Sequence, residues 1–427
     1  MSFKIRKKSD YSRQEVNIMK SRLSRIVDYA YENVPFYMEQ DNIESYIGNI
    51  NNPEDMRSLP ITSKDELISN NKEILSVKAI TEYINKRLRV EHTSGSTGKC
   101  LTIYWNKNDY KKSMMELWLL RYKYYGIKPD DKVCYFFTTR ELDLDSEKGL
   151  YEDDKSLAIS KIYLVPEMFF ELYEKIERFD PVWMILQPST ADILCDFIEK
   201  NNLMVFKNLK YIEFSGEILS DSLRKRVKEI FNVKIADQYG ANEFNSIAYE
   251  CPCGNMHIME SNVYVETCEP KNAEGELLIT TLTNKTMPLI RYRVGDIGKI
   301  GHVDCKCGNK SPVITLMTGR ANDFIKCEDG ERLSSYVFVR AIDRVNIITN
   351  GKIKQFKVTQ TNINVFRVDM VIDEEDTESV DDICSIFIDS VREKQLDNVE
   401  YEFYFHYELM KVTGGRKYKY FERNMVK

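Results

Sequence analysis

Residues 92–100 read HTSGSTGKC, a loop rich in glycines and hydroxyls between two strand-like runs, LRVE at 88–91 and LTIYW at 101–105. Glycines let successive backbone N–H groups converge, and Thr and Ser hydroxyls add donors, so such a loop binds phosphate oxygens. A Walker A loop has four residues between its glycines and a Ser or Thr after its lysine. Here two residues separate the glycines and Cys100 follows Lys99, which excludes a P-loop nucleotidase. The alternative is an ordinary surface turn, since turns are often built from these residues.

The composition indicates a soluble globular protein. The chain has 427 residues, 43% of them hydrophobic, enough for two domains or one large domain with an appendage. A secretory signal requires an apolar segment after the basic N-terminus, and none follows it here. No apolar run approaches the length of a membrane span. Lys and Arg number 61 and Asp and Glu 67, and the net charge of −6 argues against nonspecific nucleic-acid binding. We expect a cytoplasmic protein that binds neither membrane nor nucleic acid.

Helix-like and strand-like segments alternate along most of the chain, which predicts an α/β fold. Beyond residue 320 the pattern changes to two alternating strands, an amphipathic helix and a further strand, which predicts a small α+β domain. We therefore expect one domain over residues 1–320 and a second over 321–427. The predicted helices cover 12–31, 109–125, 190–200, 220–231 and 380–394, and the predicted strands 132–137, 183–189, 211–217, 354–360, 364–372 and 399–409.

Four further segments accompany the opening loop: QYGANEF at 238–244, RYRVGDIG at 291–298, TGRANDFIK at 318–326 and GGRKYKYF at 414–421. Together with TSGSTGK they resemble, in order, the motifs of the adenylate-forming superfamily, with Cys100 where proline is usual. NVPFY, LPITSKDEL, FSGEILS and MPLIRYRVGD are most similar to the phenylacetate–CoA ligase branch and its capsular-polysaccharide relatives. The resemblance covers nearly the whole chain. It implies a large N-terminal domain of packed α/β sheets and a small mobile α+β C-terminal domain.

The resemblance also implies a reaction in two steps. A carboxylate attacks the α-phosphorus of ATP to give an acyl-adenylate and pyrophosphate, and the acyl group then passes to a thiol of CoA or of an acyl or peptidyl carrier protein. An amine or hydroxyl acceptor, in natural-product or polysaccharide biosynthesis, is the alternative. The predicted acid is aryl or otherwise apolar, because Trp183, Ala241 and Phe244 fall in the stretches expected to line its pocket. Asn242 and Asn245 leave a hydroxybenzoate or an amino acid open. A homodimer is a further expectation.

Site residues follow from the motifs. Lys417, Glu243 and Thr97 are the predicted catalytic residues, Glu243 as a ligand of Mg²⁺, which prefers oxygen ligands. GGRKYKYF leaves Lys419 as the alternative to Lys417. Asp296 is expected to accept the ribose hydroxyls, and Tyr239 to stack near the adenine. The remaining predicted nucleotide-binding residues are Thr93, Ser94, Gly95, Ser96, Gly98, Lys99, Ser215, Gly216, Glu217, Gln238, Gly240 and Arg320. The alternative for each acidic or basic residue among these is an ordinary charged side chain on the surface, in contact with water.

Two C-x-C-G segments, CPCG at 251–254 and CKCG at 305–308, lie about fifty residues apart. Two thiolate pairs suit tetrahedral zinc, which takes four nitrogen or sulfur ligands. The candidates are Cys251, Cys253, His257, Cys305 and Cys307, one more than zinc needs, so the sequence leaves Cys253 and His257 as alternatives. Because no acidic or water-activating partner is evident, we predict a structural zinc. A disulfide or two unrelated buried pairs are the alternatives.

Overall fold

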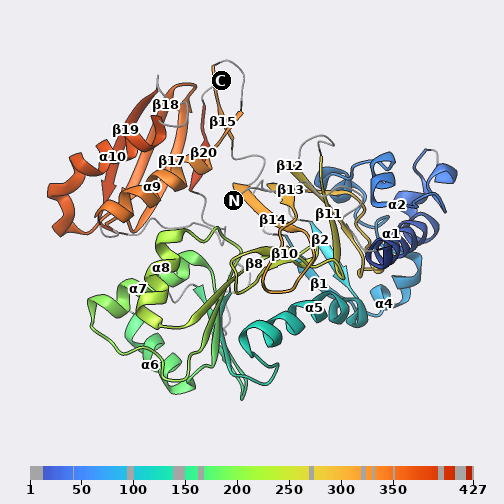
Figure 1. Ribbon diagram of the computed structural model, residues 1–427, viewed down its shortest axis with the longest axis horizontal. Coiled ribbons are helices and arrows are strands. Elements are labelled where there is room, and N and C mark those ends of the chain that lie inside the picture. Colours follow the sequence, from blue (N-terminus) through green and yellow to red (C-terminus); the bar gives the residue numbers. More distant parts are fainter. Residues whose placement is uncertain are drawn as a thin grey trace. The chain divides into compact units, whose positions relative to one another are not determined.

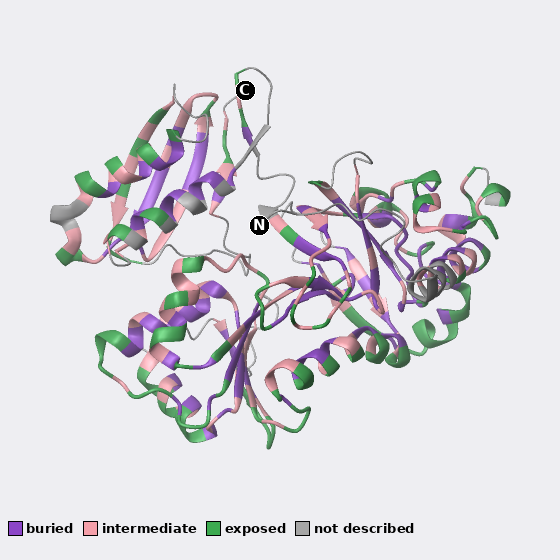
Figure 2. Ribbon diagram, in the orientation of Figure 1, coloured by how far each residue is buried: buried purple, intermediate pink, exposed green. Residues whose placement is uncertain are grey.

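A computed structural model describes residues 13–41, 43–93, 101–137, 150–161, 168–268, 274–318, 324–328, 332–349, 352–392, 399–408 and 420–425. The chain forms two compact units, the first of residues 1–129 and 236–316 and the second of 130–235 and 317–427. Figure 1 shows their elements, and Figure 2 shows buried residues gathered along the strands of each. Among the described residues, no helix is both long and apolar enough to cross a membrane.

The first unit contains sheet strands in the order β11-β12-β13-β14-β10-β9-β8, together with the two-stranded β1–β2 pair. Its pairs β8–β9, β9–β10, β10–β14, β11–β12 and β12–β13 are antiparallel. The strands are β1 (Arg89–His92), β2 (Thr102–Trp105), β8 (Lys234–Ala241), β9 (Asn245–Glu250), β10 (Met256–Ile258), β11 (Val263–Thr267), β12 (Glu274–Thr281), β13 (Tyr292–Gly301) and β14 (Val313–Thr318). The helices are α1 (Arg13–Asn33), α2 (Pro35–Met38), α3 (Lys64–Ser69), α4 (Ile80–Ile84) and α5 (Lys107–Tyr125).

Local signals in the sequence set several of these boundaries. The predicted helix from residue 12 is α1, which ends at Asn33, and Pro35 occupies the first position of α2. Ser63 is the N-cap of α3: its hydroxyl accepts from the backbone N–H of Glu66, and the Glu66 carboxylate accepts from the N–H of Ser63, which together form a capping box. Helix α5 ends at Gly126, whose φ of 74° is the left-handed conformation that glycine adopts most easily.

The first part of the second unit alternates strands and helices as predicted. Its sheet has the order β7-β6-β3-β5-β4, in which β7, β6, β3 and β5 are parallel and β4 is an antiparallel edge. The elements are β3 (Val133–Phe137), β4 (Leu150–Glu152), β5 (Ser156–Ser160), α6 (Phe169–Phe179), β6 (Trp183–Leu186), α7 (Pro188–Lys200), β7 (Tyr211–Ser215) and α8 (Asp221–Phe231). Loops at the carboxyl ends of such strands are where α/β proteins carry functional groups.

The second part of that unit, residues 324–425, is called the C-terminal part below. Its sheet has the order β19-β18-β17-β20, and α9 and α10 pack together with it around one apolar core (Figure 1). The elements are β15 (Phe324–Lys326), β16 (Arg332–Ser334), α9 (Tyr336–Thr349), β17 (Gln355–Asn362), β18 (Val365–Val371), α10 (Val380–Arg392), β19 (Glu400–His406) and β20 (Phe421–Arg423). The antiparallel β17–β18 hairpin, the helix and the following strand confirm the predicted α+β pattern. Short 3₁₀ helices lie at Ile43–Ser45, Pro53–Ser58, Val77–Ala79 and Glu374–Ser379.

Candidate functional site

The base of the HTSGSTGKC loop is closed by hydrogen bonds between its ends. Strands β1 and β2 pair antiparallel with His92 opposite Thr102. Beyond them the N–H of Thr93 donates to the carbonyl of Leu101 at 2.9 Å, and the N–H of Leu101 donates to the Thr93 hydroxyl at 2.9 Å. Thr93 is buried. The predicted phosphate-binding residues 94–99, and Cys100, lie outside the described residues.

The QYGANEF segment forms the turn between β8 and β9. At Gly240 an added Cβ would come within 2.3 Å of the carbonyl oxygen of Asn245, so no other residue fits without moving the backbone. The turn places Glu243 in a buried position, where its carboxylate accepts a hydrogen bond from the Tyr292 hydroxyl at 3.2 Å. Gln238 donates to the Ser246 hydroxyl at 3.1 Å across the same turn. The segment is therefore a rigid hairpin that holds one acid inside the unit.

Three of the predicted motifs meet in the first unit. The Tyr239 hydroxyl, from β8, donates to a carboxylate oxygen of Asp296, from β13, at 2.7 Å. The side-chain amide of Asn242 donates to the backbone carbonyl of His92 at 2.6 Å, directly before the phosphate-type loop. Gly295, with a φ of 85°, supplies the left-handed residue before Asp296. Residues about 150 and 57 positions apart are thus brought together by the β-sheet.

His92 takes part through its backbone and its ring. Its Nδ1 lies 3.2 Å from the hydroxyl of Thr102, on the neighbouring strand. This contact holds the ring against the neighbouring strand, and a carboxylate nucleophile has no proton for a base to remove.

Arg291 is the first residue of the RYRVGDIG motif, and its structural role was not predicted from the sequence. Its Nε lies 2.7 Å from a carboxylate oxygen of Glu266, and the two side chains are only 7% and 6% exposed. Its guanidinium also donates to the carbonyls of Arg57 and Leu59. The backbone of Thr62 pairs with Arg291 and Arg293, at 3.1 and 2.9 Å. Arg291 therefore fixes the LPIT segment beside the start of β13.

The predicted adenine-side segment lies in the second unit, at the carboxyl end of β7. Gly216 has a φ of 84°. The two carboxylate oxygens of Glu217 accept from the backbone N–H and the hydroxyl of Ser189, each at 2.9 Å. Ser189 lies in the first turn of α7, where a negative charge is favourable. Glu217 thus joins the loop after β7, which begins at Ser215, to the start of α7.

Two residues expected to line the acid pocket are core residues instead. Trp183 is buried at the amino end of β6, whereas Ser189 follows the carboxyl end of that strand. Its ring stacks on Tyr211, with centroids 6.3 Å apart, and its Nε1 donates to the carbonyl of Asp131. Phe244 is fully buried in the core of the first unit. The expectation for Trp183 is wrong because the four residues of β6 separate it from the functional edge of the sheet.

Four of the five candidate metal ligands converge in the first unit. The ligand atoms of Cys251, His257, Cys305 and Cys307 all lie within 4.8 Å of one another. The sulfurs of Cys251 and Cys305 are 3.6 Å apart, and Cys307 Sγ lies 3.5 Å from His257 Nε2. A tetrahedral zinc with Zn–S near 2.3 Å and Zn–N near 2.0–2.1 Å puts its ligand atoms roughly 3.5–3.8 Å apart. The geometry therefore fits zinc and selects His257, while Cys253 is exposed and outside the group of four.

Neighbouring groups orient these ligands. His257 Nδ1 lies 3.0 Å from the carbonyl of Ser311, which leaves Nε2 toward the thiols. The Asn255 amide donates to Cys305 Sγ at 3.2 Å, and the Tyr124 hydroxyl, from α5, lies 3.8 Å from Cys307 Sγ. Burial raises the pKa of the Cys305 thiol, but donors from Cys307, His257 and Asn255 outweigh it and bring the pKa to about 6. A thiolate is the form that binds metal.

The remaining predicted residues, Arg320, Lys417 and Lys419, lie outside the described residues, as do Asn322 and Asp323 of the junction. The strands that flank the Lys417 segment are described: β19 ends at His406 and β20 begins at Phe421, where it pairs parallel with β17.

Solved structures share the fold. The chain resembles a 2-hydroxyisobutyryl-CoA ligase in complex with its acyl-adenylate, with a TM-score of 0.77 and 16% identity, over 97% of this chain and 90% of the other. It also resembles an anthranilate CoA ligase bound to anthranoyl-AMP, with a TM-score of 0.53 and 15% identity, over 77% and 65% of the two chains. At these identities the likeness establishes the fold.

Sequence comparison places the chain more narrowly. No family model matches it. It is similar to a phenylacetate–coenzyme A ligase of Thermus thermophilus, 27% identical over 327 residues that cover 72% of this chain and 71% of the relative. A phenylacetate–coenzyme A ligase of Escherichia coli is 25% identical over 295 residues, 65% of each chain. Protein CapK of Staphylococcus aureus is 23% identical over 320 residues, 73% of this chain and 69% of the relative. These similarities and the shared fold support the predicted resemblance to the adenylate-forming superfamily and its phenylacetate–CoA ligase branch.

The resemblance to the adenylate-forming superfamily accounts for Tyr239, Asp296 and Glu243 as an ordered set of motif residues. An aspartate or glutamate taken alone predicts no function, and only its position within a motif predicts a role in nucleotide or metal binding. By contrast, the superfamily motifs did not single out Glu266 or Ser189, the partners of Arg291 and Glu217. Their contacts depend on strands and helices far apart in the sequence.

Proposed function

We propose that the protein activates a carboxylic acid with ATP and transfers the acyl group to the thiol of CoA. In the first step a carboxylate oxygen attacks the α-phosphorus, and the bond to the β-phosphate breaks, so that pyrophosphate leaves with the electron pair. In the second step the thiolate sulfur attacks the acyl carbon and AMP leaves. The observation that carries the proposal is the meeting of Tyr239 with Asp296, from two separate motifs, at 2.7 Å.

Asp296 is the proposed acceptor for the ribose hydroxyls of ATP. The Tyr239 hydroxyl already donates to one oxygen of its carboxylate, which fixes the orientation of the group. A carboxylate has about four lone-pair sites, so it can accept ribose hydroxyls as well. The same hydrogen bond fixes the ring of Tyr239, the proposed adenine neighbour.

Glu243 is the proposed protein ligand of Mg²⁺. Its carboxylate is buried, and a buried acid is favourable when a cation neutralises it. Mg²⁺ neutralises charge on the phosphates of ATP, and the donors of residues 93–99 would hold the β- and γ-phosphates. The hydrogen bonds between Thr93 and Leu101 join the two ends of that segment.

Zinc is the proposed metal of the Cys251–His257–Cys305–Cys307 cluster, in a structural role. A set of three thiols and one imidazole with tetrahedral spacing matches closed structural sites, which leave no position for water. Such a metal would join the segment after β9 to the segment after β13 and supply no chemistry to the reaction.

The acid and the acceptor are the finer parts of the proposal. We propose an aryl or other apolar acid, with phenylacetate as the first substrate to test because the relatives of Thermus thermophilus and Escherichia coli are named for it. A carrier-protein thiol, or an amine or hydroxyl, is the alternative acceptor. Since ATP and CoA are intracellular substrates, the proposed reaction belongs in the cytoplasm.

A pyrophosphate-release assay tests the proposal. The full-length protein with ATP and Mg²⁺ is offered phenylacetate, hydroxybenzoates, fatty acids and amino acids, first without and then with CoA. Release with one class of acid, followed by a thioester detected by mass spectrometry, is the expected result. Lys417→Ala should abolish release, since the resemblance assigns this lysine to the carboxylate and α-phosphate. Silence with every acid would contradict the proposal, and release without a thioester would redirect it to the other acceptors.

A further inference from the structure

The second unit contains two separate apolar cores. One is formed by residues between Cys134 and Val233, and the other by residues between Ile325 and Phe421, and the two share no member. Among the described residues, ion pairs join α7 to the C-terminal part, while α8 and α9 lie in contact nearby. Contacts of this kind separate at low cost compared with a continuous apolar core, because the charges regain water.

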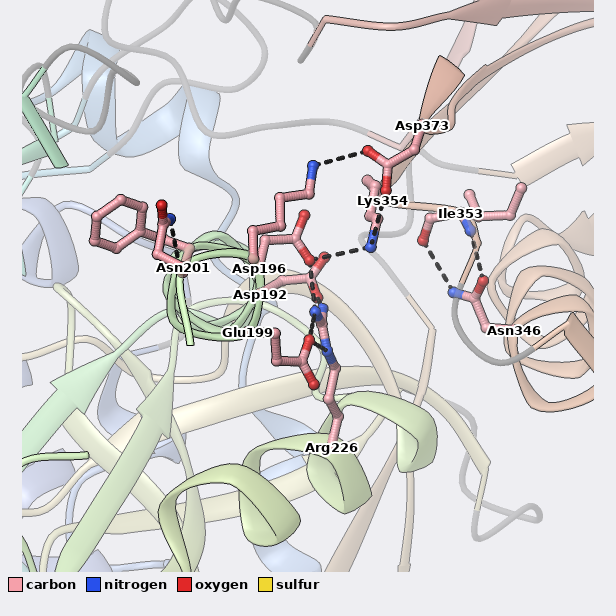
Figure 3. Close-up of polar contacts among 11 residues, drawn as sticks. Asp192, Asp196, Glu199, Asn201, Arg226, Asn346, Ile353, Lys354 and Asp373 are labelled. Carbon is pink, nitrogen blue, oxygen red and sulfur yellow. Dashed lines mark hydrogen bonds and ion pairs between the residues drawn. The ribbon is translucent and has the colours of Figure 1, made fainter. Parts of the chain in front are cut away.

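The ion pairs across this contact are reciprocal. Lys354 Nζ, from the C-terminal part, lies 3.2 Å from an oxygen of Asp196 on α7. In return, Lys200 Nζ of α7 lies 2.8 Å from an oxygen of Asp373, which also lies 3.8 Å from Lys354. Figure 3 shows Lys354 between Asp196 and Asp373. The side chains of Lys354 and Asp196 are only 15% and 20% exposed, so this pair is the better shielded from solvent.

The face of α7 carries an excess of negative charge that Lys354 offsets. Asp192, Asp196 and Glu199 lie on one side of the helix, and all three accept from the guanidinium of Arg226 on α8 (Figure 3). The contacts to Asp192 and Asp196 are 2.6 Å each. One cation facing three carboxylates leaves the group negative, and Lys354 is the cation that arrives from the C-terminal part. The acidic face is thus complementary to a single basic side chain.

Lys354 is held in a defined position by its own neighbours. Its backbone N–H donates to the carbonyl of Val371 at 2.8 Å, so Lys354 and Asp373 lie at the same end of the β17–β18 hairpin. The side chain of Asn346, on α9, pairs with the backbone of the preceding residue, Ile353, through contacts of 2.9 and 3.1 Å. The hairpin end therefore presents one cation and one anion on a fixed backbone.

We propose that Lys354 and Asp196 are positioning residues for the proposed reaction. Their ion pair, with Asp373 and Lys200, forms an ionic contact, called the seat below, that holds the C-terminal part against α7 during one of the two half-reactions. The inference rests on the proposed function, with Lys417 as its predicted catalytic lysine, and on the mobile C-terminal domain that the resemblance implies. An ionic seat with separate apolar cores on either side suits a contact that forms and breaks in every turnover.

Charge reversal in the full-length protein tests the seat. Lys354→Glu places an anion against Asp196 and Asp373, while Asp196→Lys leaves Asp192 and Glu199 to pair with Arg226. Adenylation is measured as pyrophosphate release from ATP and phenylacetate without CoA, and thiol transfer as consumption of preformed phenylacetyl-adenylate by CoA. We expect each single variant to slow one half-reaction about tenfold and to change the other less than about twofold. The double variant should recover most of the loss.

Lys352→Glu is the matched control, because the ion pair of Lys352 with Asp376, at 3.1 Å, lies within the C-terminal part. It should leave the ratio of the two half-reactions unchanged. Equal slowing of both half-reactions by Lys354→Glu, without recovery in the double variant, would indicate a merely structural role and overturn the proposal. Unchanged rates would overturn it as well.

Amide hydrogen exchange gives a readout that does not depend on activity. Lys354→Glu should raise exchange in peptides of α7 and of residues 352–373, the double variant should restore it, and Lys352→Glu should leave α7 unchanged. If the wild type releases no pyrophosphate with any acid, the proposed reaction fails while exchange still reports on the seat. If exchange in α7 does not respond to Lys354→Glu or Lys354→Gln, the seat itself is refuted.

Discussion

At the scale of single residues, Asp296 and Tyr239 give the sharpest test of nucleotide binding. Asp296→Ala removes the proposed acceptor of the ribose hydroxyls and should weaken ATP binding about tenfold to a hundredfold, the effect of losing hydrogen bonds to a charged group. Isothermal titration calorimetry with ATP and Mg²⁺ measures it. Tyr239→Phe keeps the ring and removes only the donor to Asp296, so its effect should be smaller. Unchanged affinity in Asp296→Ala would exclude the ribose role.

Arg291 lies in the same motif as Asp296, and we expect it to act on stability. Arg291→Met leaves Glu266 as a buried carboxylate without its partner, which should lower the free energy of unfolding by about 3–5 kcal/mol. Arg293→Met is the control, since its ion pair with Glu276 is 44% and 21% exposed and should contribute no more than about 1 kcal/mol. Chemical denaturation compares the two. A similar decrease in the free energy of unfolding in both variants would show that the buried Arg291–Glu266 pair contributes no more than the exposed pair.

Sequence reasoning succeeded best at residues whose role is local or shared by a motif. At the start of α3 it left Thr62 and Ser63 as alternative N-caps, and the capping box with Glu66, three residues on, selects Ser63. It placed Tyr239 and Asp296 in one site only through the resemblance, and it could not foresee their hydrogen bond. Trp183 was misread because an aromatic residue in a strand is equally typical of a core position and of a binding pocket. The partners of Arg291 and Glu217 depend on packing between distant elements.

At the scale of elements, the metal cluster joins the turn after β9 to the segment after β13. Removing zinc with a chelator should lower the melting temperature by several degrees or more, because structural zinc contributes directly to folding free energy. Metal analysis of the native protein should find one zinc per chain. His257→Ala and Cys307→Ser should lose the metal, whereas Cys253→Ser should keep it. Native protein without zinc, or loss of the metal in Cys253→Ser, would contradict the assignment.

The acidic face of α7 predicts a pH dependence of stability. Burial raises the pKa of Asp192 to about 6, although Arg226 opposes the shift. Between the ordinary value near 4 and this value the folded protein binds more protons than the unfolded chain, so stability falls as pH rises. The contribution of Asp192 is complete below about pH 4 and is lost as pH rises through 6.

Asp192→Asn removes this titration and isolates it. The melting temperature of the wild type minus that of Asp192→Asn should fall by about 2–4 °C between pH 4 and 7. Calorimetric scans at matched ionic strength measure the difference, since salt screens the Arg226 contacts as well. A difference that stays constant or rises over this range would show that the carboxyl is ionised throughout.

At the scale of the whole molecule, alternation of strands and helices predicted the fold class and the α+β pattern of the last hundred residues. It could not predict that residues 130–235 and 317–427 form one compact unit while 1–129 and 236–316 form another. Such grouping depends on which distant strands pair, and periodicity within a segment carries no information on that. The division at residue 320 is a prediction from the change in strand and helix pattern along the chain, whereas the compact units follow contacts in space.

Separate apolar cores predict that parts of the chain lose structure separately. Phe338 is fully buried in the C-terminal part, and its ring lies 5.5, 6.1 and 5.7 Å from those of Phe366, Phe387 and Phe421. Phe338→Ala should cost about 3–5 kcal/mol, because it leaves a cavity among these rings. None of these residues belongs to the other two large cores, so the loss should stay within β17–β20, α9 and α10.

Calorimetry and amide hydrogen exchange together test this separation. In Phe338→Ala one thermal transition should move to lower temperature, exchange should rise in peptides of β17 and β18, and peptides of β8–β14 should keep their protection. Phe214→Ala, in the core of the first part of the second unit, is the matched control and should affect β6 and β7 instead. A single transition that shifts as a whole, with exchange rising in every element, would mean that the cores unfold as one cooperative structure.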